Sequence, residues 1–311
     1  MKNFFQNMFL SEKRMLQAYA SSDRGQFRDE NQDNFLILQL EKDRVNACSL
    51  AEETYHKTIA KNWPETYIRV AVADGMGGHE GGRQISEAVI RGLMRIPPRK
   101  TPQAMRSAIM ELHRKLRLKF SSKSEKSPGT TLVMADIERK SGKGVMLSIG
   151  DSRAFLLSKS QWDQVTHDHH ISEFSWRDGE ISREDYEKRL KAGGHRIAQA
   201  LGYGAAGIVR DKNGHKPYRF DPGIRLDLEK ELPPDLSEHA DVFTFRFSPG
   251  DILMLASDGL WSAKSGGSWW KTVSGELFSQ DGVNQLIQSA VKDHEVYDNV
   301  TVVMCGFKTQ T

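Results

Sequence analysis

The sequence predicts an α+β fold in which antiparallel sheets carry helices on their outer sides. Many short apolar or alternating runs are bounded by Gly, Asp and Ser, a pattern typical of β-strands. Two stretches of helical periodicity follow the third of these runs without a strand between them, which disfavours the regular alternation of a parallel sheet. Short links such as "IGDSRAF" at 149–155 are typical of hairpins, and hairpins join antiparallel strands.

The elements can be assigned in chain order. Apolar or alternating runs predict strands at 18–22, 34–40, 67–73, 130–137, 144–149, 153–157, 242–247, 252–257 and 300–306. One helical stripe is formed by Ile85, Ala88, Val89, Gly92, Leu93 and Ile96, and a second by Met105, Ile109, Leu112, Leu116 and Phe120. Both stripes leave polar residues on the opposite face, so each helix should pack one side against a sheet.

The chain of 311 residues is long enough for one large domain or two ordinary ones. Two polar regions, near 41–65 and 171–240, have few periodic apolar residues, but apolar strands resume after each. We therefore expect a single domain over 1–311 with its core at about 18–307, and we interpret both regions as loop insertions.

Composition excludes several classes of protein. The chain has 44 basic and 41 acidic residues, and this even balance is not that of a nucleic-acid binder. Cys48 and Cys305 are too few for a disulfide framework, which fits a reducing compartment. No apolar run has the length of a membrane span, and no secretory signal is evident at the N-terminus. The sequence thus predicts a cytoplasmic protein that binds neither nucleic acid nor membrane.

Five aspartates lie where predicted strands begin or end. "RVAVAD", "MLSIGD" and "LMLASD" end on Asp74, Asp151 and Asp258, whereas Asp33 and Asp298 directly precede "NFLILQL" and "NVTVVMC". In antiparallel sheets the ends of some strands and the beginnings of others share one edge, so these carboxylates can meet there. Any one aspartate in such a place is usually only a turn residue, and it is the joint placement that indicates a site.

Carboxylates gathered in this way require cations, because they cannot all remain ionised close together without neutralisation. An all-oxygen ligand set selects hard divalent ions, Mg²⁺ or Mn²⁺. The glycines after Asp74 fit this prediction. Gly75 would allow a backbone carbonyl to approach a metal, and the bare Gly77–Gly78 turn would keep the edge open to a substrate.

Seven segments carry a family resemblance. They are, in order, "SSDRGQFRDENQDNF", "VADGMGGHEGG", "SPGTTLVMADI", "LSIGDSRAFLL", "VTHDHH", "LMLASDGLW" and "YDNVTVVMC". Together they resemble the signature blocks of the metal-dependent protein phosphatases of type 2C, and "DGMGGH" is similar to the bacterial branch. The resemblance spans residues 20–306. It implies a four-layer fold, a β-sandwich flanked by helices on both outer faces, with a two-metal site that hydrolyses phosphoserine and phosphothreonine in proteins.

The resemblance also implies roles for individual residues. Metal ligands would be Asp33, Asp74, the Gly75 carbonyl, Asp258 and Asp298, and Asp151 would bind a third, weaker ion. Arg28 would hold the substrate phosphate, since its planar fork suits phosphate oxygens. Met76 stands where eukaryotic relatives carry a histidine proposed as general acid, and His79 is the candidate to replace it. The substrate would be a phosphorylated protein, and an opposing Ser/Thr kinase is expected. The stretch after residue 170 falls where bacterial members carry a mobile flap.

Other interpretations remain open at this level. A catalytically inactive, phosphoprotein-binding relative would lack a metal aspartate, whereas all five are present. A two-metal nuclease shares the carboxylate chemistry, but it predicts a concentrated basic groove. "HDHH" at 167–170 has the composition of a zinc cluster, although adjacent residues of an extended segment point in opposite directions.

Overall fold

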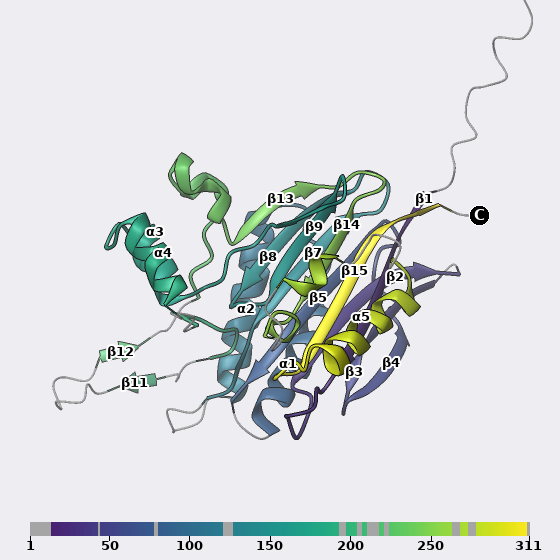
Figure 1. Ribbon diagram of the computed structural model, residues 1–311, viewed down its shortest axis with the longest axis horizontal. Coiled ribbons are helices and arrows are strands. Elements are labelled where there is room, and N and C mark those ends of the chain that lie inside the picture. The colour runs from purple at the N-terminus through teal and green to yellow at the C-terminus, as the bar shows by residue number, and fades with distance from the viewer. Residues whose placement is uncertain are drawn as a thin grey trace, which may run out of the picture.

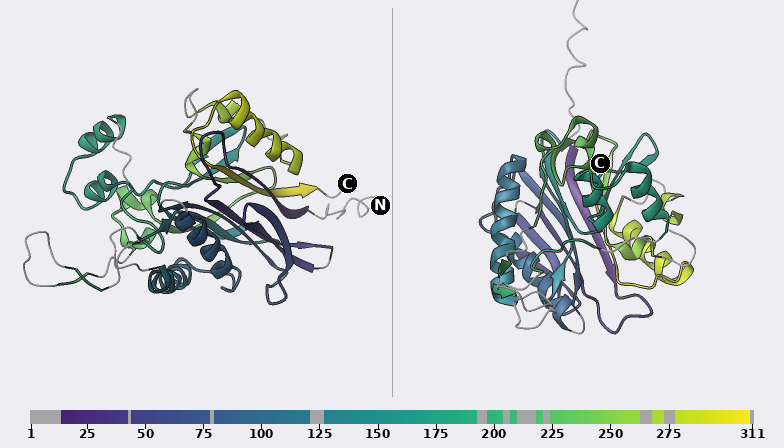
Figure 2. Two further views of the ribbon diagram at one scale, coloured as in Figure 1. Left: turned by 90° about the horizontal axis from the view of Figure 1, so that it is seen from below. Right: turned by 90° about the vertical axis from the view of Figure 1, so that its left-hand side faces the viewer.

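The computed structural model of the chain describes residues 14–42, 44–77, 80–120, 127–192, 197–203, 207–209, 218–220, 224–262, 268–272 and 278–309. In this part of the chain the strands form two main antiparallel sheets that pack face to face, with helices outside them (Figures 1 and 2). No helix among these residues is long and apolar enough to cross a membrane.

The larger sheet has the described strand order β13-β8-β7-β5-β2-β3-β4, and β6 pairs with β5 beside it. Its strands are β2 (Asp33–Glu41), β3 (Arg44–Ala51), β4 (Thr54–Ile59), β5 (Tyr67–Met76), β6 (Gly129–Thr130), β7 (Leu132–Glu138), β8 (Lys143–Ile149) and β13 (Val242–Arg246). The central strands β5 and β7 are buried over nearly their whole length, which explains their continuous apolar sequence.

The smaller sheet has the described order β1-β15-β14-β9-β10. Its strands are β1 (Arg14–Asp23), β9 (Arg153–Ser158), β10 (Gln161–Gln164), β14 (Ile252–Ala256) and β15 (Val300–Thr309). Side chains from both sheets interdigitate between them in a continuous apolar cluster that includes Phe35, Val70, Val133, Leu255 and Val303. This cluster is the central layer of the sandwich.

Helices cover both outer faces (Figure 2). Helices α1 (Glu80–Leu93) and α2 (Pro102–Phe120) pack their apolar stripes on the larger sheet, and α5 (Gln280–Asp293) packs on the smaller one. Short 3₁₀ turns η3 (Asp258–Leu260) and η4 (Trp269–Thr272) lie on the same side as α5. The predicted four-layer arrangement is therefore confirmed.

A buried arginine anchors the C-terminal end of α1 to the larger sheet. Arg69 on β5 is fully buried and donates to both carboxylate oxygens of Asp136 on β7, at 2.6 and 2.7 Å. It also donates to the carbonyls of Leu93 and Ile96, at 2.6 and 2.8 Å. Leu93 is the last residue of α1, and its carbonyl also accepts from the Ile96 backbone amide at 3.2 Å in the turn that follows the helix. One side chain thus fixes the far end of the helix whose first turn borders the aspartates.

A further segment projects from one end of the sandwich (Figure 1). It contains α3 (Ile171–Arg177), α4 (Arg183–Lys191), the paired strands β11 (Gly207–Val209) and β12 (Tyr218–Phe220), and the 3₁₀ turns η1 (Glu229–Glu231) and η2 (Pro234–His239). Helix α3 has buried residues, whereas none in α4 is buried. The two helices therefore differ in how firmly they are held.

All nine predicted strand regions are strands in the structure, but the interpretation of 41–65 as a loop insertion is wrong. This region forms β3 and β4, which continue the larger sheet beyond β2. Every residue of β4 is exposed, so its sequence lacks the alternation that identifies a half-buried strand. The insertion at 171–240 contains the helices α3 and α4, in agreement with the short helix or two that the pattern of 173–190 predicts, together with short strands.

Candidate metal and phosphate site

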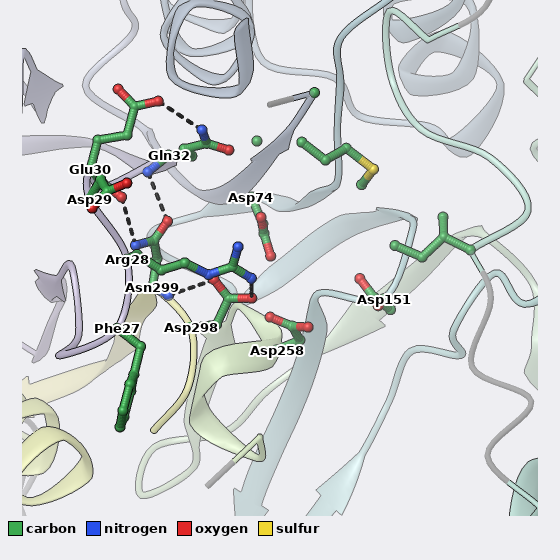
Figure 3. Close-up of a pocket in the computed structure, with 14 residues that line it drawn as sticks. Phe27, Arg28, Asp29, Glu30, Gln32, Asp74, Asp151, Asp258, Asp298 and Asn299 are labelled. Carbon is green, nitrogen blue, oxygen red and sulfur yellow. Dashed lines mark hydrogen bonds and ion pairs between the residues drawn. The ribbon is translucent and has the colours of Figure 1, made fainter. Parts of the chain in front are cut away.

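A cavity of about 820 Å³ opens at one end of the sandwich, and aspartates line it (Figure 3). Asp74, Asp151, Asp258 and Asp298 contribute carboxylates to its wall, and Arg28 contributes the guanidinium. The sequence prediction that strand ends bring aspartates to one edge is therefore correct for these four.

The fifth aspartate, Asp33, lies beside them. It is the first residue of β2 and sits opposite Asp74 in the pairing of β2 with β5. Asp33 is only 2% exposed, and its Oδ2 accepts a hydrogen bond from Ser257 Oγ at 2.6 Å. Its other carboxylate oxygen, Oδ1, is buried without a hydrogen-bond partner. A buried polar atom left in this state is costly unless another group binds it.

Asp258 reaches the cavity from the other sheet. It follows β14 and is the first residue of η3. Its backbone carbonyl accepts from the backbone amides of Trp261 and Ser262, both at 3.0 Å. Asp258 Oδ1 is also buried without a hydrogen-bond partner. Asp298 lies two residues before the start of β15, and Asp151 lies in the connection from β8 to β9.

The protein alone disfavours ionisation of these carboxyl groups. Burial, with the charges of neighbouring aspartates, raises the pKa of Asp33 and of Asp151 to about 7 and that of Asp258 to about 6. Burial and then Asp33 raise the pKa of Asp74 well above its ordinary value. A divalent cation would reverse this effect by favouring the charged form.

The residues present fit hard divalent cations. All the donors are oxygens, and two carboxylate oxygens are buried without partners. Within the described residues, no three acidic, histidine or cysteine side chains converge on one point as a ready-made ligand group. The carboxylates instead surround the cavity, as mutual repulsion would require of such a group.

Arg28 points into the cavity and forms an ion pair with Asp298 (Figure 3). The side chain of Arg28 is 54% exposed, so it remains accessible to a ligand. The hydrogen bond to Asp298 raises the pKa of Arg28 above its ordinary value, and the side chain stays cationic.

Asn299, which the sequence interpretation missed, holds the loop that carries Arg28. The side-chain NH2 of Asn299 donates to the backbone carbonyls of Arg24 and Glu30, at 2.8 and 3.0 Å. Its side-chain oxygen accepts from the backbone N–H of Gln32 at 2.9 Å. One side chain therefore closes both ends of the loop. In the sequence, only its position directly after the candidate ligand Asp298 marks Asn299 as a possible site residue.

Gly75 lines the cavity and is also required by the packing of α1. A Cβ on Gly75 would lie 2.1 Å from the carbonyl oxygen of Gly82, in the first turn of α1. Likewise, a Cβ on Gly82 would lie 2.3 Å from Gln32 Oε1. These glycines thus allow a helix terminus to approach the strand ends, in addition to any role of the Gly75 carbonyl.

His79, the candidate general acid, lies outside the described residues, as does Gly78. Met76 lines the cavity and is the last residue of β5.

The "HDHH" segment does not form a zinc site in the described structure. Asp168 makes two hydrogen bonds with Arg153, at 2.9 and 2.7 Å, and His167 stacks on His239 with ring centroids 3.7 Å apart. No metal-ligand group includes these residues in the described part of the chain. The side chains point to different partners, as expected for an extended segment.

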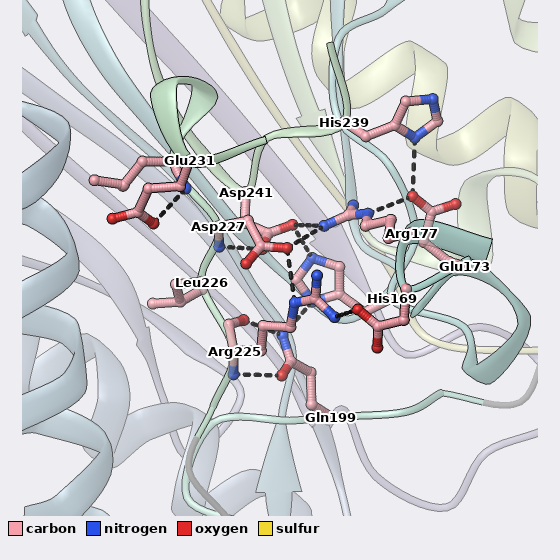
Figure 4. A network of polar contacts seen from close by, with 12 residues as sticks. His169, Glu173, Arg177, Gln199, Arg225, Leu226, Asp227, Glu231, His239 and Asp241 are labelled. Carbon is pink, nitrogen blue, oxygen red and sulfur yellow. Dashed lines mark hydrogen bonds and ion pairs between the residues drawn. The ribbon is translucent and has the colours of Figure 1, made fainter. Parts of the chain in front are cut away.

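His169 is fully buried, and Figure 4 shows it beside Gln199 and Asp241. Its Nδ1 accepts from the backbone amide of Gly150 at 3.2 Å and from the Gln199 side chain at 2.7 Å. The proton must therefore lie on Nε2, which donates to Asp241 at 3.0 Å. Because Gly150 directly precedes Asp151, His169 braces the loop that presents Asp151.

Arg177 extends this network into α3 (Figure 4). Its buried guanidinium donates to Glu173 at 2.7 Å and to Asp241 at 2.8 Å. His239 Nδ1 lies 2.8 Å from the same Glu173 oxygen. Burial opposes the ionisation of Glu173, but the contacts with His239 and Arg177 prevail and lower its pKa to about 2. Helix α3 is therefore held on the sandwich by charged contacts.

Comparison with known proteins gives the family. The model of the family described as protein phosphatase 2C matches residues 55–261. The chain belongs to this family. Serine/threonine phosphatase stp of Listeria monocytogenes is 31% identical over 254 residues, which cover 79% of this chain and 78% of that protein. The alignment with stp of Listeria welshimeri is shorter, 32% identical over 179 residues, and covers 55% of this chain and 61% of that protein.

Solved structures agree on the fold. The Streptococcus agalactiae serine/threonine phosphatase superposes with a TM-score of 0.61 at 21% identity, covering 94% of this chain and 99% of that one. The catalytic domain of PstP, determined with two manganese ions, superposes with a TM-score of 0.54 at 22% identity, covering 94% and 99%. The family and fold predicted from the sequence are confirmed, and so is the reaction class, that of a metal-dependent serine/threonine protein phosphatase.

Proposed function

We propose that the aspartate cavity binds two Mn²⁺ or Mg²⁺ ions and hydrolyses phosphoserine and phosphothreonine in proteins. Asp33, Asp74, Asp258 and Asp298, with the Gly75 carbonyl, would hold these ions. The observation that carries the proposal is the pair of buried carboxylate oxygens without partners, one on Asp33 and one on Asp258. A divalent cation satisfies such oxygens and offsets the crowding of negative charge.

Asp151 would bind a third ion. It is separated from the paired aspartates by its place in the β8–β9 connection, and the backbone just before it is braced by the hydrogen bond between Gly150 and His169. Burial raises its pKa to about 7, so a nearby cation would convert it to the charged form.

The reaction assigned here is direct hydrolysis. When bound, the two cations supply a nucleophile by lowering the pKa of water and stabilise charge on the phosphate oxygens. Arg28 would bind two of these oxygens through its planar fork, exchanging Asp298 for the substrate. Asn299 keeps the Arg28 loop in position while this exchange occurs. We assign to His79 the donation of a proton to the leaving serine or threonine oxygen.

The substrates would be phosphorylated proteins, and a Ser/Thr kinase would oppose this phosphatase. A cytoplasmic location remains a prediction from the sequence. A two-metal nuclease, which predicts a concentrated basic groove, is disfavoured because the chain carries a formal net charge of only +3 and Arg28 is the one basic residue among the described residues that line the cavity.

The test is release of phosphate from a phosphothreonine peptide with Mn²⁺, with Mg²⁺ and with EDTA, alongside cleavage of DNA and RNA. Phosphate release that needs the added metal, with intact nucleic acid, is expected. Full activity in chelator, or cleavage of nucleic acid alone, would contradict the proposal. An inactive, phosphoprotein-binding relative would bind the peptide in Mn²⁺ without releasing phosphate.

A further inference from the structure

Two large aromatic side chains are exposed at the mouth of the aspartate cavity. Phe27, which lines the cavity, is 57% exposed, and Tyr297 is 47% exposed. Their rings contact each other, with centroids 5.3 Å apart and planes tilted by 41°. Exposed apolar area of this kind, beside a site, is typical of a binding surface.

The two rings belong to the same pair of segments as the ionic residues of the cavity. Phe27 and Tyr297 directly precede Arg28 and Asp298, so a pair of contacting rings adjoins an ion pair formed by the same two segments. Phe27 and Arg28 both line the cavity. In Figure 3 the Phe27 side chain points away from the aspartates while Arg28 reaches toward Asp298, so the contacting rings of Phe27 and Tyr297 lie at the border of the cavity.

This border is firmly held. Asn299 fixes both ends of the loop that carries Phe27, and the Gln26 side chain donates to the Val291 carbonyl of α5 at 2.9 Å. Val296, the residue before Tyr297, is fully buried. Hydrogen bonds and burial thus hold the backbone that carries the rings, so ordering the rings should cost little of the free energy of binding a ligand.

We propose that Phe27 and Tyr297 form an apolar subsite for the side chain that flanks the phosphorylated residue of the substrate. The inference rests on the proposed function, since it takes Arg28 as the phosphate-binding group. An extended peptide advances about 3.3 Å per residue, so a residue one or two positions from the phosphoresidue reaches the ring that neighbours Arg28. The flanking side chain would be aliphatic or aromatic, and it would gain affinity by covering the exposed rings.

The rival occupant is a basic side chain stacked on the rings, which acidic residues nearby would favour. Of these, Glu30 is already engaged by Arg83 at 3.3 Å and by the Gln32 side chain at 2.7 Å. Asp29 also lines the cavity, so the Lys peptide in the experiment below tests this rival directly.

The experiment compares phosphothreonine peptides that differ at a single flanking position, occupied by Leu, Lys or Ala. With Mn²⁺, wild-type protein should show a kcat/KM roughly tenfold higher for the Leu than for the Ala peptide at one flanking position. Phe27→Ala and Tyr297→Ala should bring this ratio close to one, whereas Phe27→Leu should retain most of it. Leu118→Ala is the control, because Leu118 on α2 is 62% exposed but does not line the cavity.

Three results would overturn the subsite: a wild-type ratio of one at every flanking position, an unchanged ratio in Phe27→Ala, or a preference for Lys over Leu. Failure of the proposed function has a different signature, which is absence of metal-dependent phosphate release from every peptide. In that case the same peptides, labelled with fluorescein, are compared by anisotropy. Tighter binding of the Leu peptide to wild type than to Phe27→Ala would still support the subsite, and equal binding would refute it.

Discussion

Asp33 and Asp74 face each other directly across the pairing of β2 and β5, and Asp33 is almost fully buried. Like charges placed opposite each other destabilise a sheet, and a buried carboxylate oxygen without a partner, such as Asp33 Oδ1, adds a further cost. The protein alone relieves this conflict only by retaining protons, as the raised pKa values of both groups indicate. The pairing is therefore best explained as a place prepared for cations.

A first prediction concerns pH. The pKa values of Asp33, Asp151 and Asp258 are raised to between about 6 and about 7, above an unfolded value of about 4. The folded metal-free protein then retains protons that the unfolded chain loses, so its stability should fall as pH rises from about 4 to about 7. Bound Mn²⁺ needs the charged groups, so it should raise the melting temperature more at pH 7.5 than at pH 5.5. Thermal unfolding with EDTA and with Mn²⁺ checks this, and an equal Mn²⁺ effect at both pH values would contradict it.

A second prediction separates metal binding from phosphate binding. Asp258→Asn should weaken Mn²⁺ binding and lower turnover by about a hundredfold or more, because it removes a charge from the proposed ligand set. Arg28→Ala should retain Mn²⁺ but raise KM for phosphopeptides, because the guanidinium binds the phosphate and supplies no ligand to the ions. Calorimetric titration with Mn²⁺ and steady-state kinetics distinguish the two variants. Unchanged Mn²⁺ affinity in Asp258→Asn would remove Asp258 from the ligand set.

A third prediction tests His79. If it protonates the leaving oxygen, His79→Ala should slow phosphopeptides far more than p-nitrophenyl phosphate, whose leaving group scarcely needs a proton. The comparison of kcat for both substrates measures this difference. Equal losses would show that His79 has another role.

A fourth prediction concerns the anchor of α1. Arg69→Met should destabilise the protein by about 3–5 kcal/mol, because it leaves Asp136 buried and uncompensated. Replacing Asp136 by Leu in the same protein should recover part of this loss. Arg114→Met is a matched control, since Arg114 pairs with Glu111 on the exposed side of α2 and its loss should leave unfolding unchanged. Urea unfolding of the four proteins decides the matter, and a single Arg69 variant as stable as the control would disprove the anchoring role.

A fifth prediction concerns the projecting segment as a specificity element. Glu173 and Arg177 are buried in the charged network and stay in place, so only the part beyond them is removed. This part includes Tyr186, which stacks on Trp176 of α3. Replacing residues 180–191, which include α4, by a short Gly-Ser link should change the relative rates on different phosphopeptides. Turnover of p-nitrophenyl phosphate should persist, since α4 has no buried residue. Unchanged relative rates, with an intact circular dichroism spectrum, would show that α4 does not select substrates.

Local patterns in the sequence predicted most of the fold and the acidic part of the site. Strand ends such as that before Asp258 are visible because an apolar run stops at a charged residue, and that signal involves only neighbours in the chain. Helix α5 was missed although Val283, Leu286, Ile287 and Ala290 have helical spacing and Ser279 caps its N-terminus, so a closer count would have found it.

Other features depend on contacts between distant parts of the chain. The role of Asn299 follows from a loop near residue 30, and nothing beside Asn299 in the sequence indicates that contact. The same holds for His169, whose partners Asp241 and Gln199 come from separate segments. A histidine-rich segment suggested a metal by composition, while the structure uses its members as hydrogen-bonding and packing groups.

The origin of the aspartates has a mechanical consequence. Asp33 and Asp74 belong to the larger sheet, whereas Asp258 and Asp298 lie at strand ends of the smaller one. Cations shared among them would cross-link the two sheets at this end of the sandwich. Metal binding is then coupled to the integrity of the sandwich, and chelation should let this end open more often. Amide hydrogen exchange near Asp74 and Asp258 should accordingly be faster in EDTA, while the opposite ends of β5 and β14 keep their protection.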